Sequence, residues 1–147
     1  MEKLIQVAVY DALRMDGSEN LIYLDEAEYQ GIYYTEPIYD LYSTSKNYAG
    51  LVKNGNTSVL LEIYTIDENI LLHLDYFHGL ATTSYMSPYT KETIKTSYGE
   101  CTIYMYDRPT IGKPKIDSGD YISWKENLKK MIKQQEEKEF SSRHSIE

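Results

Sequence analysis

TSVLLEIYTIDENILLHLDYFHG, residues 57–79, is the stretch that decides the fold. Residues 57–66 form an apolar run rich in β-branched side chains, which predicts a buried strand and gives the best strand pattern in the chain. Asp67 is placed to cap a helix over residues 68–75. Gly79 follows, and glycine is a common residue just beyond a helix end because it adopts left-handed dihedral angles without steric cost. The stretch therefore predicts a strand followed by a helix.

Shorter strand patterns lie on both sides of this stretch. We expect strands at residues 4–10, 29–34, 38–42, 48–52, 93–96 and 101–106. Asn54-Gly55 is the dipeptide favoured in two-residue hairpin turns, so a hairpin is expected between residues 48–52 and the strand at 57–66.

A helix rich in lysine and glutamate is expected over residues 124–139. Many strands with few helices predict an α/β (α+β) protein, specifically a small mixed β-barrel with flanking helices. We divide the chain into a domain at residues 1–125, an amphipathic helix at 126–139 and a disordered tail at 140–147.

Composition excludes several classes of partner. The chain has 147 residues and a formal net charge of −8, and an acidic surface disfavours binding to a nucleic acid polymer, which needs clustered lysine and arginine. No apolar run approaches membrane-spanning length, so we expect no membrane partner. The single cysteine, Cys101, excludes an intrachain disulfide and any zinc site built from several cysteines, and it fits a cytoplasmic protein. His73, His78 and His144 lack metal-ligand spacing, so neither a metal nor a cofactor is expected.

Tyrosine dominates the aromatic residues, with 16 tyrosines against two phenylalanines and one tryptophan. Each buried tyrosine needs a partner for its hydroxyl group. These rings therefore suit the lining of a polar cavity as well as a core, and composition alone leaves both open.

Four segments resemble motifs of one family in the same order. They are VAVYDALRMDGSEN (residues 7–20), YAGLVKNGNTSVLLEIYTID (48–67), ILLHLDYFHG (70–79) and IDSGDYISW (116–124). Together they make the chain similar to the γ-glutamylcyclotransferase-like (AIG2-like) superfamily, as a divergent member. The resemblance implies a small mixed barrel with a cavity at one end.

The resemblance also implies a reaction. In active members the first loop presents backbone N–H groups to the α-carboxylate of a γ-glutamyl group. A glutamate in the motif L-D-x-x-E-G acts as general acid and base, and the substrate's α-amine attacks its own side-chain amide. The products are 5-oxoproline and an amine, and orientation supplies much of the acceleration in such an intramolecular attack.

Two departures fall on the motifs that carry this chemistry. Asp11 replaces the loop glycine, and His78 replaces the catalytic glutamate. Two unit charges about 4 Å apart repel by about 1 to 4 kcal/mol at effective dielectric constants between 80 and 20, so an ionised Asp11 opposes a substrate carboxylate. An imidazole transfers protons near neutral pH, but His78 lacks the negative charge that attracts an ammonium group. The pattern indicates a pseudoenzyme that has kept the scaffold.

We therefore expect a non-catalytic protein that binds a small molecule in the cyclotransferase cavity and sequesters a nucleotide-like or phosphorylated signalling ligand. Such a protein suits a bacteriophage that blunts host defence, and it would then act in the host cytoplasm. The expected ligand-binding residues are Tyr10, Asp11, Ala12, Leu13, Arg14, His78, Tyr85 and Arg108.

Two alternatives stay open. The first is an active γ-glutamyl(amine) cyclotransferase in which His78 or Glu62 is the catalytic residue. The second is a protein-interaction module that uses the helix from Trp124. A homo-oligomer is compatible with each of these hypotheses.

Overall fold

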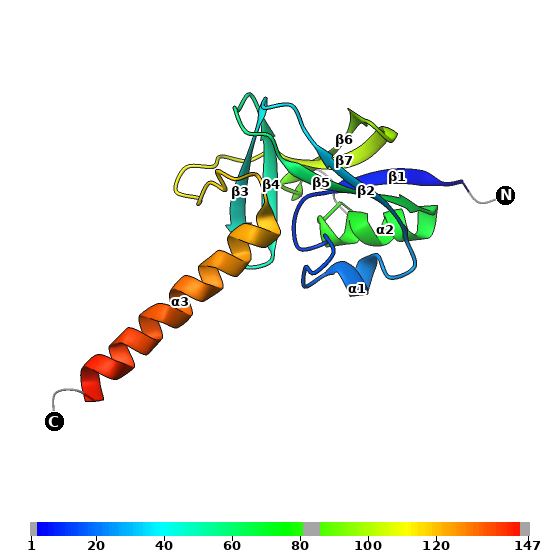
Figure 1. Cartoon of the computed structure of the whole chain (residues 1–147). Helices are drawn as coiled ribbons and strands as arrows, with labels where there is room; N and C mark the ends of the chain where they lie inside the picture. The colour runs from blue at the N-terminus through cyan, green and yellow to red at the C-terminus, as the bar shows by residue number, and fades with distance from the viewer. Residues whose placement is uncertain (1–2, 81–85, 145–147) are drawn as a thin grey trace.

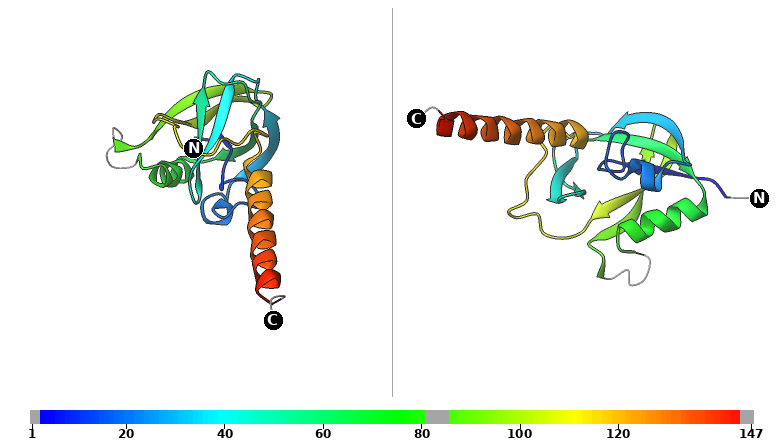
Figure 2. Two further views of the ribbon diagram at one scale, coloured as in Figure 1. Left: turned by 90° about the vertical axis from the view of Figure 1, so that its left-hand side faces the viewer. Right: turned by 90° about the horizontal axis from the view of Figure 1, so that it is seen from below.

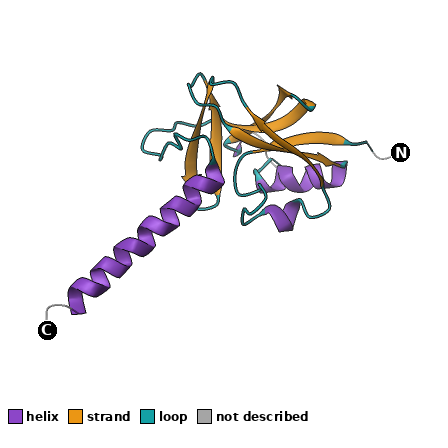
Figure 3. Ribbon diagram, viewed as in Figure 1, coloured by secondary structure: helices purple, strands orange, loops and turns teal. Residues whose placement is uncertain are grey.

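The computed structural model describes residues 3–80 and 86–144 (Figure 1). Its strands are β1 (Ile5–Val9), β2 (Glu28–Tyr34), β3 (Tyr39–Ser45), β4 (Tyr48–Lys53), β5 (Leu60–Ile66), β6 (Tyr89–Thr96) and β7 (Gly99–Tyr106). Its helices are α1 (Asn20–Tyr23), α2 (Glu68–Phe77) and α3 (Tyr121–His144). Figure 3 shows that strands form the centre of the molecule, with the short helices to one side. The mixed α+β class predicted from the sequence is confirmed.

The main sheet has the strand order β2-β5-β1-β7-β6. β5 pairs antiparallel with both β1 and β2, whereas β1 pairs parallel with β7. β3 and β4 pair with each other and form a separate two-stranded ribbon. Isolated bridges also join Tyr39 to Thr57 and Tyr42 to Lys115. The sheet is open at β2 and β6, so the expected closure into a barrel is wrong: the ribbon does not join its two edges.

The expected hairpin at Asn54-Gly55 is also wrong. β4 pairs with β3 rather than with β5, and the ribbon's own turn lies at residues 45–48. Asn54 has φ of 64°, a left-handed conformation that asparagine tolerates better than other non-glycine residues. The Asn54-Gly55 turn thus carries the chain from the ribbon into the main sheet.

The central strands β1 and β5 of the main sheet are buried on both faces. Alternate side chains of β1 enter different clusters, because side chains alternate across a strand: Ala8 packs on the ribbon side, and Val7 and Val9 pack on the helix side. On the helix side the partners include Leu24 and Leu74, near α1 and within α2. This two-sided burial explains the nearly continuous apolar sequence of β5.

α3 projects away from the rest of the molecule (Figures 1 and 2). It begins at Tyr121, three residues before the predicted start, and continues through residues 140–144, which were expected to be disordered. Tyr121 and Trp124 pack on the core, whereas side chains from residue 129 to residue 141 are exposed.

Candidate functional site

α2 places His78 at a defined point. The Asp67 side chain accepts a hydrogen bond from the Ile70 N–H (2.8 Å) at the start of the helix, as predicted. At the other end Gly79 has φ of 76°, and the Leu80 N–H donates to the Asp75 carbonyl (2.8 Å). His78 therefore lies at the C-cap, where the helix end fixes its backbone.

The His78 imidazole is buried and surrounded by rings. It stacks on Tyr104 with ring centroids 3.7 Å apart, and it meets Phe77 and Tyr89 edge to face. Its Nδ1 lies 2.8 Å from the Leu74 carbonyl. A carbonyl only accepts hydrogen bonds, so Nδ1 carries the proton and Nε2 keeps its lone pair. Burial lowers the pKa of His78 to about 4, which leaves the ring neutral at physiological pH.

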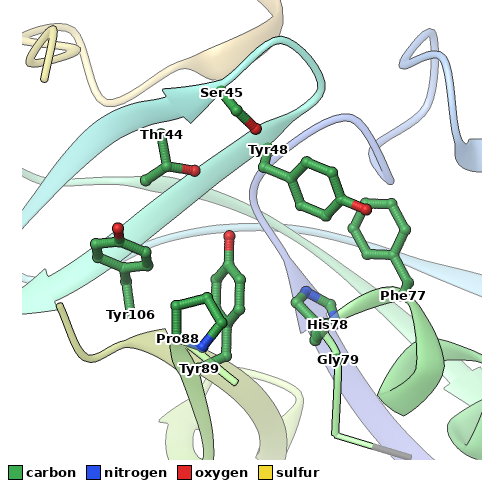
Figure 4. Close-up of a pocket in the computed structure, with 9 residues that line it drawn as sticks. All are labelled: Thr44, Ser45, Tyr48, Phe77, His78, Gly79, Pro88, Tyr89 and Tyr106. Carbon is green, nitrogen blue, oxygen red and sulfur yellow. The ribbon is translucent and has the colours of Figure 1, made fainter. Parts of the chain in front are cut away.

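A pocket of about 340 Å³ opens beside His78 (Figure 4). It lies between the turn of the β3–β4 ribbon, the end of α2 and the strands β6 and β7, and the described residues that line it are Thr44, Ser45, Tyr48, Phe77, His78, Gly79, Pro88, Tyr89 and Tyr106. Figure 4 shows the rings of Tyr48, Tyr89 and Tyr106 around this space. The Tyr89 hydroxyl donates to the Ala49 carbonyl (2.8 Å). No described lining residue carries a charge at neutral pH, so the pocket offers ring faces and hydroxyl groups.

In the loop at residues 10–17, a backbone N–H group donates a hydrogen bond to the side chain of Asp11. The Leu13 N–H donates to Asp11 Oδ1 (3.1 Å). Desolvation by burial raises the pKa of Asp11 to about 7, opposed by the hydrogen bond from Leu13. Gly17 permits the tight turn that follows, because a Cβ there would lie 2.2 Å from the Ala12 carbonyl oxygen.

An ion-paired network fixes the other side of this loop. Arg14 Nε donates to Glu62 Oε2 (2.8 Å), and Arg14 Nη1 donates to Asp120 Oδ1 (2.8 Å). Glu62 Oε1 accepts from the Met15 N–H (2.7 Å) and from the Tyr64 hydroxyl (3.0 Å). Both carboxylate oxygens of Glu62 are thus engaged, and the network ties β5 to the loop and to the start of α3.

The structure separates the residues predicted for the site. His78 lines the pocket, whereas Tyr10, Ala12 and Leu13 belong to the two core clusters. The Tyr10 hydroxyl donates to the Tyr104 carbonyl (2.7 Å). None of these three is among the described residues that line the pocket, and neither are Asp11, Arg14 and Glu62.

One further predicted residue, Arg108, lies at the edge of the pocket. Arg108 donates to the carbonyl of Ser87 (3.0 Å), next to Pro88 in the lining, and so lies beside the pocket. Tyr85 lies outside the described residues.

Sequence reasoning missed much of the lining. Tyr48, Phe77, Tyr89 and Tyr106 were not singled out, although they surround His78. Phe77 directly precedes His78, and the excess of tyrosine already suggested a cavity lined with hydroxyl-bearing rings. What the sequence could not show is that the ends of four strands, β3, β4, β6 and β7, meet beside the end of α2.

Within residues 3–80 and 86–144, no group of three or more histidine, cysteine, aspartate or glutamate side chains is arranged to hold a metal ion. No described helix combines the length and the apolar character needed to cross a membrane.

Comparison with known proteins identifies the family to which this fold belongs. Residues 7–123 match the family described as Gamma-glutamyl cyclotransferase, AIG2-like. A Vibrio cholerae relative is 36% identical over 115 residues, which cover 78% of this chain and 93% of that protein. The Gamma-glutamylcyclotransferase family protein YtfP of Escherichia coli is 34% identical over 118 residues, which cover 80% of this chain and 96% of its own.

Solved structures agree. The solution structure of Escherichia coli YtfP covers 80% of this chain and 96% of its own at a TM-score of 0.61 and 30% identity. A crystal structure from Pyrococcus horikoshii covers 84% of this chain and 95% of its own at a TM-score of 0.68, and its 22% identity supports the fold alone. The four motifs, the fold and these matches together show that the chain belongs to the γ-glutamylcyclotransferase, AIG2-like, family.

Proposed function

We propose that the His78 pocket binds a small ligand through an uncharged, planar part and does not turn over γ-glutamyl compounds. One observation carries this proposal: the described residues that line the pocket are ring-bearing or neutral, with no charged side chain among them. Aromatic faces with a few hydroxyl groups are suited to a flat ligand that makes few polar contacts.

A γ-glutamyl group fits this lining poorly. It carries an α-ammonium and an α-carboxylate, and an ion buried without a partner costs several kcal/mol, by order of magnitude. The neutral imidazole of His78 supplies no negative charge for the ammonium. This mismatch opposes binding of the substrate expected of an active family member.

The loop supports the same conclusion. The resemblance assigns its backbone N–H groups to the substrate carboxylate, but the N–H of Leu13 already donates to Asp11. A substrate carboxylate would have to displace the Asp11 side chain from a buried position. The chain's own carboxyl group thus competes for the expected anion site.

A nucleotide-like ligand remains part of the proposal in one orientation. Its base would lie among the rings, and its phosphate would point towards Arg108, which sits beside the lining residue Pro88. Sequestration of such a ligand by a bacteriophage protein is the biological role that we propose for this arrangement.

Equilibrium dialysis against a pool of nucleosides, nucleotides and γ-glutamyl amines tests the proposal. We expect depletion of a ring-bearing compound that returns unchanged when the protein is heated. Tyr48→Ala should weaken this binding at least tenfold, because Tyr48 lines the pocket and stacks on Phe77. The matched control is Tyr34→Ala, an exposed tyrosine of β2 outside the lining; equal effects of the two substitutions would sink the proposal.

The second candidate function is cyclotransferase activity with His78 as the base. Membership of the family supports this activity more directly than it supports ligand binding without turnover. The specific observation is the free lone pair on Nε2, which the Leu74 hydrogen bond leaves available. With its pKa near 4, His78 is about as basic as an ordinary glutamate, whose pKa is about 4.3.

In this candidate reaction, both the attacking amine and the amide that it cleaves belong to the substrate. The α-amine forms a bond to the γ-carbonyl carbon, His78 accepts the amine proton and returns it to the departing nitrogen, and 5-oxoproline and a free amine result. His78→Ala should then abolish 5-oxoproline release while the fold is retained. Retained activity in that variant would exclude His78 as the base.

A further inference from the structure

A second pocket lies at the base of α3. It shares no lining residue with the His78 pocket, although both are bounded by the turn of the β3–β4 ribbon. Its volume is about 200 Å³. The loop at residues 16–18, the turn of the β3–β4 ribbon and the first turns of α3 form its walls, and the described residues that line it are Ala12, Asp16, Gly17, Ser18, Lys46, Asn47, Tyr121, Ile122, Lys125, Glu126 and Lys129.

Three lysines converge on this pocket without a carboxylate partner. Three other lysines among the described residues form ion pairs: Lys53 with Glu92, Lys91 with Asp75, and Lys115 with Asp40 and Asp117. By contrast, no ion pair within 4.0 Å involves Lys46, Lys125 or Lys129 in the part of the chain that the structure describes.

The ammonium groups are close enough to repel one another. Burial lowers the pKa of Lys125, and the charges of Lys129 and Lys46 lower it further. Lys125 Nζ donates to the Lys46 carbonyl, which holds it at the turn. Asp16 and Glu126 also line the pocket and partly offset the positive charge, but three cations remain against two anions.

We infer that this pocket binds a small organic anion, with its carboxylate or phosphate group among the three ammonium groups. The apolar part of the ligand would lie on Ala12, Tyr121 and Ile122. The volume is below the range of about 300–1,000 Å³ typical of drug-sized ligands, so the ligand is the size of a single ring or short chain. Family membership does not account for the site, because Lys125, Glu126 and Lys129 follow the family match, which ends at residue 123.

Nuclear magnetic resonance titration of the full chain with phenyl phosphate and with benzoate tests the inference, and benzyl alcohol is the uncharged comparison. We expect amide shifts to concentrate at Gly17, Ser18, Asn47 and residues 121–129, with either anion binding at least tenfold more tightly than the alcohol. The ranking of phosphate against carboxylate then identifies the preferred anion.

The double variant K125Q/K129Q should weaken anion binding at least tenfold. The control K130Q/K133Q removes the same two charges from exposed positions of the same helix outside this pocket, and it should bind as the wild type does. Equal losses in the two variants, or equal binding of the alcohol, would overturn the inference. Shifts confined to Tyr48 and Tyr89 would also overturn it, because they report the His78 pocket instead.

Discussion

The loop at residues 10–17 and the pocket beside His78 derive from two motifs of the same family, yet they bury opposite kinds of group. The loop is held by charges, since Arg14 joins Glu62 and Asp120 in a partly buried network. The pocket presents rings and a neutral imidazole. The difference teaches that buried charges hold the loop in place, whereas the described residues that line the pocket carry no charge at neutral pH.

The largest expected effect comes from breaking the charged framework. Arg14→Ala leaves Glu62 buried without its cation, and loss of one partner of a buried ion pair costs about 3–5 kcal/mol. The free energy of unfolding, measured in urea, should fall by that amount. Lys53→Ala breaks the exposed pair with Glu92, which solvent screens, so the free energy of unfolding should fall far less than in Arg14→Ala. A similar loss in the two variants would contradict the difference between the buried and the exposed pair.

Asp11→Asn should stabilise the protein above neutral pH. The folded-state pKa of Asp11 is raised from 3.8 to about 7, so the folded chain holds a proton that the unfolded chain has lost. Wild-type stability from this group is therefore present at low pH and is lost as pH rises from about 4 to about 7. A shift of about three pKa units corresponds to at most about 4 kcal/mol. Unfolding at pH 8 and pH 4 measures the gain, and a variant that is less stable at pH 8 would contradict the buried, strained carboxyl group.

His78→Gln should remove a slope of the opposite sign. The folded-state pKa of His78 is lowered from 6.5 to about 4, so the unfolded chain binds the proton first. Stability from this group is full above pH 6.5 and is lost as pH falls towards 4. The shift corresponds to about 3 kcal/mol at most. Between pH 4 and pH 6.5, His78 makes the free energy of unfolding increase with pH, and the variant should lack this increase. The same pH dependence in the variant and the wild type would mean that His78 is protonated in the folded protein over this range.

The smallest effect concerns the helix end that positions His78. Gly79→Ala introduces a Cβ with ordinary contacts to Ser87 but at φ of 76°, so only backbone strain of about 1–2 kcal/mol is expected. Thermal unfolding should show a fall of a few degrees for a domain of this size. No change would show that the left-handed conformation at the end of α2 is not required.

The sequence predicted the elements better than their arrangement. The helix cap at Asp67 and the helix end at Gly79 were found because caps are local patterns. The pairing of β4 with β3 was missed, because Asn54-Gly55 carries a local turn preference that long-range pairing overrides.

The site shows the same limit. His78 was identified from its motif, and the structure places it in a pocket. The engagement of the Leu13 N–H by Asp11 and the ring lining from Tyr48 and Tyr89 depend on contacts between distant segments. No single stretch of sequence records those contacts.

Mass-spectrometric detection of 5-oxoproline from a panel of γ-glutamyl amines tests the central claim most directly. The wild-type chain is compared with His78→Ala and with the double variant Asp11→Gly/His78→Glu, which restores the family's residues at both departures. We predict no 5-oxoproline above background from the wild type or from His78→Ala, and release only from the double variant. Release by the wild type that His78→Ala abolishes would contradict the account and show that the neutral pocket is a working active site.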